Sequence, residues 1–149
     1  MPCLDRQKIL AADDRKPKRV RLEVPEWGGH LWLGVMSGID RDDWENASAD
    51  RADNESKLAR LEKRAYDWKR VAAMTRARVV AWCAEDDDGK PLFGRDEESV
   101  AALAEKSGPV LSRLFTVAAE LNALSKQDVE DILGKYGGVP SDAASSVSP

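Results

Sequence analysis

Two short runs near the N-terminus alternate apolar and polar residues, and this pattern constrains the fold more than any other feature of the chain. The apolar positions recur at every second residue, at Val20, Leu22 and Val24 and then at Leu31, Leu33 and Val35. Alternate residues of a strand share one face, so the two runs predict a β-hairpin with its turn at residues 25–29. An isolated hairpin is marginal in water, and its apolar face therefore needs a cover from the rest of the chain.

The sequence after residue 37 has mainly helical periodicity, which predicts an α+β, mostly helical fold. We expect a small antiparallel sheet or hairpin packed on a bundle of about five helices, one of them long. Short helices are expected over about 4–12, 40–47, 96–107, 110–124 and 125–134, and residues 49–54 form either a loop or a solvated continuation of the helix before them. In residues 55–85 apolar residues recur at spacings of three and four, which favours a single helix roughly 45 Å long. Its second half and the helix 110–124 are expected to cover the hairpin.

The chain has 149 residues, a length typical of one domain. We expect a single domain over 18–136, preceded by a loosely ordered segment, 1–17. Within the domain, residues 50–75 are expected to form a basic helical arm. Composition predicts a disordered tail over 137–149 because Gly, Ser and Pro predominate there.

Charge is segregated along the chain, although the net formal charge is only −4. Residues 57–78 contain eight basic and two acidic residues, whereas residues 40–55 contain seven acidic and two basic ones. A basic helix that also carries Tyr66 and Trp68 raises the possibility of nucleic-acid binding. We rank this interpretation low, because Trp68 lies at a position that favours packing on another helix and the chain as a whole is acidic.

No constellation of catalytic or metal-binding residues is found. Cys3 and Cys83 are far apart with no nearby Cys or His, and His30 is the only histidine, which leaves no zinc spacing and no catalytic triad. The acidic turn 85–90 lacks carboxylates at the first and twelfth positions of a calcium loop. We therefore expect no enzyme activity, no cofactor and no metal. No apolar run is long enough to span a bilayer, so no membrane partner is expected.

Large apolar residues at positions without an obvious cover are candidates for contact with other proteins. Trp27 lies at the tip of the expected hairpin, and Trp32 lies on the face opposite the apolar one. Leu58, Leu61 and Trp68 belong to the seam of apolar residues over 58–82, which is also a possible surface for self-association. We take these five residues as the candidate protein-interaction surface.

Several segments together resemble the tail assembly chaperones of long-tailed, siphovirus-type bacteriophages. The resemblance covers residues 4–134, apart from a longer and more charged stretch at 50–75. The similar segments are Ile9-Leu10-Ala11-Ala12-Asp13-Asp14, Val24-Pro25-Glu26-Trp27-Gly28-Gly29, Ser37-Gly38 with the acidic helix after it, Asp86-Asp87-Asp88-Gly89-Lys90-Pro91-Leu92-Phe93, and Leu114 to Ser125 leading into Asp128-Val129-Glu130.

The resemblance implies a non-catalytic role in the cytoplasm of the infected host. Such chaperones coat the long helical tape measure protein, keep it soluble, bring tail tube subunits to it and are absent from the mature virion. A frameshifted longer form is common in the family. Two alternatives stay open: a permanent structural tail or connector protein of the virion, and a small nucleic-acid-binding regulator.

Overall fold

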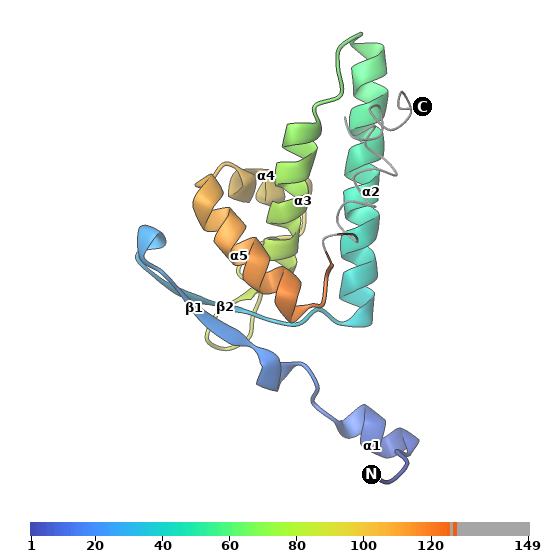
Figure 1. Ribbon diagram of the computed structural model, residues 1–149, viewed down its shortest axis with the longest axis vertical. Coiled ribbons are helices and arrows are strands. Elements are labelled where there is room, and N and C mark those ends of the chain that lie inside the picture. Colours follow the sequence, from blue (N-terminus) through green and yellow to red (C-terminus); the bar gives the residue numbers. More distant parts are fainter. Residues whose placement is uncertain (126, 128–149) are drawn as a thin grey trace.

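The computed structural model describes residues 1–125 and 127. The chain forms a small antiparallel sheet and a set of helices packed on one of its faces (Figure 1). The helices are α1 (Arg6–Ala11), α2 (Gly38–Leu61), α3 (Trp68–Cys83), α4 (Glu97–Ala104) and α5 (Gly108–Leu121), and the strands are β1 (Val20–Val24), β2 (Gly29–Leu33) and β3 (Ala84–Glu85). The predicted α+β, mostly helical fold is confirmed.

The predicted hairpin is present, and a third strand extends it. β1 and β2 pair antiparallel with Leu22 opposite Leu31, and β3 pairs with the outer edge of β2, so that the strand order is β1-β2-β3. The hairpin turn is a short 3-10 helix, η2 (Pro25–Trp27), followed by Gly28 with a φ of 78°. This left-handed conformation is costly for residues with a Cβ, which explains the glycine after Trp27.

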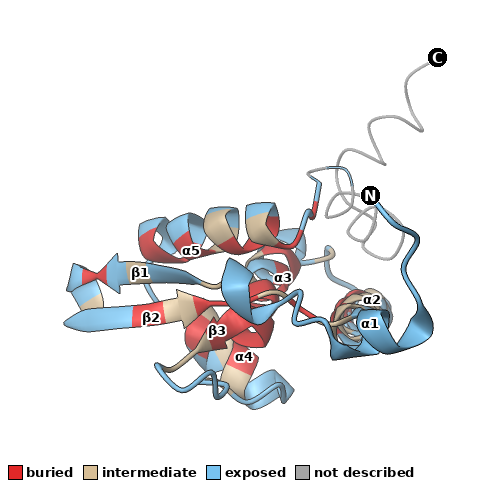
Figure 2. Ribbon diagram, turned by 90° about the horizontal axis from the view of Figure 1, so that it is seen from below, coloured by how far each residue is buried: buried red, intermediate tan, exposed pale blue. Residues whose placement is uncertain are grey.

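Helix α3 lies at the centre of the molecule and contacts α2, α4, α5 and β2. Eleven of its sixteen residues are buried, which accounts for its apolar character on several faces. Val24, Leu31 and Leu33 of the hairpin join α3 and α5 in one hydrophobic core. In Figure 2 the buried segments, in red, lie on the parts of the sheet, α3, α4 and α5 that are close to one another, in agreement with the expected cover over the hairpin.

The prediction of one long helix over 55–85 is wrong, because the chain reverses direction at residues 62–67. Helix α2 is instead continuous from Gly38 to Leu61, through the polar stretch in which the predicted first helix ended at about residue 47. It ends in a Schellman motif, in which Lys63 has a φ of 53° and the Arg64 N–H donates to the Ala59 carbonyl at 3.0 Å. Residues 50–75 therefore comprise the end of α2, the turn at 62–67 and the start of α3.

Helix α2 packs on α3 along a narrow stripe, which explains why its sequence lacks strong helical amphipathicity. The buried residues of this stripe recur at spacings of three and four and are mostly small: Trp44, Ser48, Ala52, Glu55 and Ala59. Small side chains permit a close approach with little apolar area. The fully buried Arg78 of α3 forms an ion pair with Glu97 of α4 and so links α3 to α4.

The structure describes the N-terminal segment in full, whereas it describes few of the residues after 124. Every residue from Met1 to Lys18 is exposed, and α1 lies apart from the other helices (Figure 1). The predicted helix over 125–134 and the predicted tail over 137–149 lie outside the described residues, except for 125 and 127.

Candidate protein-interaction surfaces

The candidate residues fall in three separate places. Leu58, Leu61 and Trp68 lie where α2 and α3 meet, and we call residues 57–70 the arm end. Trp27 lies at the hairpin turn, at the other side of the helical bundle (Figure 1). Trp32 lies on the polar face of the sheet. The five candidate residues therefore do not lie on one surface, and each place is described separately.

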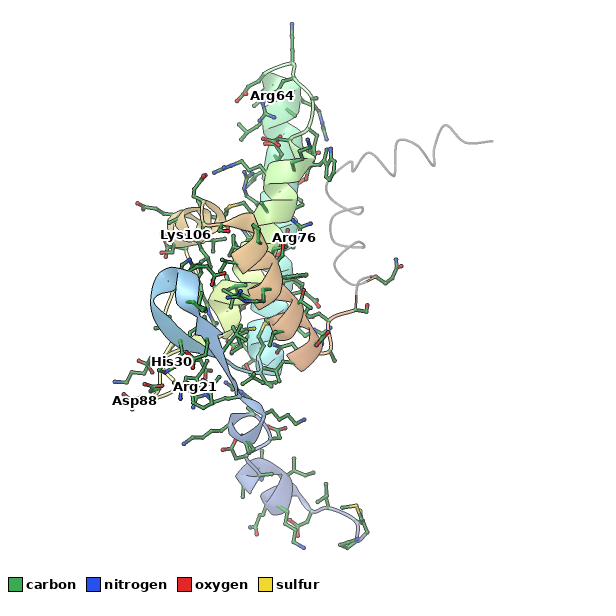
Figure 3. The ribbon with its side chains drawn as sticks, turned by 60° about the vertical axis from the view of Figure 1, so that its left-hand side comes forward. Arg21, His30, Arg64, Arg76, Asp88 and Lys106 are labelled. Atoms are coloured by element: carbon green, nitrogen blue, oxygen red, sulfur yellow. The ribbon has the colours of Figure 1, made fainter. Side chains whose placement is uncertain are left out.

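The arm end exposes large apolar side chains next to cations. Leu58 is 43% exposed, Leu61 is 79% exposed and Trp68, the first residue of α3, is 38% exposed. Leu58 and Leu61 are three residues apart and so share one side of α2. Residues 57–70 carry six basic and two acidic residues, a net charge of +4. Figure 3 shows Arg64 at this end of the molecule, far from Arg21 and His30 on the hairpin.

A buried carboxylate holds the turn of the arm end in place. Both Glu55 oxygens accept from the Arg64 guanidinium, at 2.6 and 3.0 Å, and one of them also accepts from the Asp67 N–H at 2.8 Å. The hydrogen bonds from Arg64 lower the pKa of Glu55 to about 2 although burial opposes the shift. Glu55 therefore stays charged at neutral pH and fixes the turn between α2 and α3.

The second place is an apolar groove of about 320 Å³ beside the hairpin turn, which we call the tip groove. It is formed by three segments that are distant in sequence, namely the hairpin turn, the loop at 92–94 and helix α4. The residues that line it are Trp27, Leu92, Phe93, Gly94, Ser99, Ala102, Leu103 and Lys106. Lys106 is its one charged lining residue, and its volume accommodates a few side chains of a partner protein.

Polar contacts on either side hold the walls of the tip groove. The Arg113 guanidinium of α5 donates to both carboxylate oxygens of Glu26, each at 3.1 Å, and this lowers the pKa of Glu26. On the other wall Asp96 caps α4 by accepting from the Ser99 N–H at 3.0 Å. A Cβ on Gly94 would lie 2.4 Å from the Asp96 carboxylate, so a larger residue at this position would displace the cap of α4.

The expectation that Trp32 lacks a cover is wrong. The Arg19 guanidinium lies over its ring at 4.4 Å from the centroid, and its indole N–H donates to Asp87 at 2.8 Å. His30 Nε2 also lies 2.8 Å from the same Asp87 oxygen. These hydrogen bonds, with that of His30 the largest effect, lower the pKa of Asp87. Trp32 thus belongs to a polar network and contributes little free apolar surface.

Two further findings concern the described residues alone. No group of three or more His, Cys, Asp or Glu side chains is arranged to hold a metal ion there. None of the helices placed in the structure combines the length and hydropathy needed to cross a bilayer.

The comparison with family profiles agrees with the resemblance found in the sequence. The sequence profile described as phage tail assembly chaperone matches residues 5–135, nearly the whole chain. A comparison with curated proteins found no match. Among solved structures, the tail assembly chaperone of bacteriophage HK97 is similar, with 23% sequence identity and a TM-score of 0.48 over 77% of this chain and 94% of that chain. On the strength of the profile match, this chain belongs to the phage tail assembly chaperone family.

Proposed function

We propose that this chain is a non-catalytic chaperone that binds the tape measure protein, keeps it soluble and brings tail tube subunits to it in the infected cell. Membership of the tail assembly chaperone family is the observation that carries the proposal. In this role the chain leaves before the virion is complete. Both partners are phage proteins, and neither contact requires a cofactor.

The two apolar surfaces support a role with two partners. The arm end is a projecting, basic surface that suits a long helical client. The tip groove is a concave, mostly apolar surface that suits a side chain of a globular subunit. Because the two surfaces lie at different sides of the helical bundle, one chain has room for both partners at once (Figure 1).

Co-expression with the tape measure protein tests the chaperone role. We expect the tape measure protein to appear in the soluble fraction with the chaperone and in the pellet without it. The contributions of the two regions to client solubility are separated by comparing the combined variant Trp32→Ala, Leu61→Asp with each single variant. We expect Leu61→Asp to reduce client solubility and Trp32→Ala to leave it unchanged, because the Trp32 ring is already covered by Arg19. Equal solubility with and without the chaperone contradicts the proposed function.

Mass spectrometry of purified virions distinguishes a chaperone from a permanent tail or connector protein. We expect peptides of the tape measure protein and the tube protein and none from this chain. Detection of the chain at a fixed ratio to the tube protein in finished particles would identify it as a structural component instead.

A further inference from the structure

We propose that the arm end binds an acidic amphipathic helix, one with an apolar stripe flanked by Asp and Glu. The proposal rests on the proposed function, since it specifies the chemistry of the client segment that the chaperone recognises. It adds what neither the family nor the fold assigns, namely which surface of this chain is used and which charge its partner carries.

The first argument is the unbalanced charge of the arm end. Arg64 is paired with Glu55 and Glu62, and Arg70 lies 3.4 Å from Glu105. Arg60, Lys63 and Lys69 are exposed and form no ion pair with any residue that the structure describes. These three cations belong to the same short segment, residues 57–70, as the exposed Leu58, Leu61 and Trp68, so a partner with carboxylates beside apolar residues complements both features.

The second argument concerns the position of Lys69, which is unfavourable for the helix that carries it. Lys69 is the second residue of α3, whose first turn contains no acidic residue. A cation there opposes the helix dipole, which favours negative charge at a helix N-terminus. The N-cap residue Asp67 supplies one negative charge at this helix end, and a carboxylate from a bound partner would supply a second one close to Lys69.

The third argument is that the arm end is rigid before a partner arrives. The buried Glu55 carboxylate fixes Arg64 and the backbone of Asp67, and Asp67 in turn caps α3 by accepting from the Arg70 N–H at 3.2 Å. A surface ordered in advance loses less conformational entropy on binding. The exposed Leu61 and Trp68 are therefore presented in one arrangement.

Titration with two designed helical peptides tests the proposal on the full chain. Both peptides carry the same leucine stripe, and their flanking positions are all Glu in one and all Lys in the other. We expect the Glu peptide to bind, with an affinity that weakens at least tenfold between 50 and 500 mM salt, and the Lys peptide not to bind, because salt screens the exposed charges. Equal binding of both peptides, or of neither, overturns the proposal.

The double variant Lys63→Glu, Lys69→Glu locates the surface. We expect at least a tenfold loss of affinity for the Glu peptide with a nearly unchanged Tm, because the favourable charge that Lys69→Glu places at the start of α3 offsets the cation that Lys63→Glu removes from the end of α2. The matched control, Lys8→Glu, Lys18→Glu, makes the same change in net charge on the exposed N-terminal segment and is expected to bind as the wild type does. Equal losses in the two double variants overturn the assignment to the arm end.

Three further measurements separate this proposal from its rivals. Displacement of the Glu peptide by a single-stranded oligonucleotide identifies a nucleic-acid site and overturns it. A change in oligomeric state that accompanies Lys63→Glu, Lys69→Glu identifies a contact between copies and also overturns it. If this variant solubilises the tape measure protein as well as the wild type does, the arm end is not the client surface while the proposed function stands. If the wild type fails to solubilise the client, the function fails, and the peptide titration alone decides the chemistry of the arm end.

Discussion

Among individual residues, Glu55 has the ionisable side chain on which the arm end depends most. Its carboxylate is 5% exposed and is neutralised by Arg64. The pKa is about 2 in the folded protein, compared with an ordinary value of 4.5. A lowered pKa contributes stability that is complete above pH 4.5 and is lost as the pH falls towards 2. The turn of the arm end is therefore an acid-sensitive part of the fold.

We predict that Glu55→Gln lowers the free energy of unfolding by about 2 kcal/mol at pH 7, because a neutral amide cannot replace the charged hydrogen bonds to Arg64. The difference from the wild type should shrink as the pH falls from 4.5 to 2. Urea unfolding at several pH values measures this. A difference that stays constant over this range would show that the charge of Glu55 does not contribute.

Asn122 joins three parts of the core through one buried amide. Its Oδ1 accepts from the Met36 N–H at 2.6 Å, and its Nδ2 donates to the carbonyls of Gly34 and Ala118 at 3.2 and 2.9 Å. We predict that Asn122→Ala lowers the free energy of unfolding by about 2–3 kcal/mol, because it leaves buried backbone groups unpaired. Asn54→Ala, at an exposed position of α2, is the control and should change it by less than about 0.5 kcal/mol. Thermal or urea unfolding of both variants checks the prediction.

At the level of elements, the hairpin and the amphipathic helix α5 were predictable because each carries its own periodicity. The break between α2 and α3 was not. A Schellman motif is normally indicated by glycine, whereas here Lys63 takes the left-handed conformation. The spacing of apolar residues by three and four also continues across residues 62–67, although the residues before and after this turn belong to two antiparallel helices. The spacing therefore gave no sign of the turn. The sequence did not decide between a loop and a continued helix in the polar part of α2, because small buried residues leave almost no hydrophobic signal.

The conformation of Lys63 leads to a prediction for the arm. Lys63→Gly should raise the free energy of unfolding by about 0.5–1 kcal/mol, because glycine adopts a positive φ without the steric cost of a Cβ. Lys57→Gly, inside α2, should lower it by about 1 kcal/mol, since glycine disfavours a helix interior. Urea unfolding of the two variants tests this. A destabilising Lys63→Gly would contradict the assigned end of α2.

At the level of the whole molecule, the sequence identified apolar residues of the arm end but not the tip groove. Trp27 was recognisable because a large aromatic at a turn tip has no local cover. Phe93, Leu103 and Lys106, which line the groove with it, come from segments distant in sequence, and only the tertiary fold brings them together. Trp32 was misjudged for the same reason, because Arg19 and Asp87 reach it from other segments.

The separation of the arm end from the tip groove predicts that the two contacts of the proposed chaperone can be lost independently. Ala102 is exposed and lines the tip groove, so Ala102→Glu should place a charge in an apolar site while changing the free energy of unfolding by less than about 0.5 kcal/mol. In pull-downs with both partners, we expect this variant to retain the tape measure protein and lose the tail tube subunit. Lys63→Glu, Lys69→Glu should show the opposite pattern.

Ala11→Glu introduces the same charge on α1, away from both surfaces, and should retain both partners. Simultaneous loss of both partners in each surface variant would mean that the two contacts form one site. It would also mean that a single chain does not hold a helical client and a globular subunit at separate places.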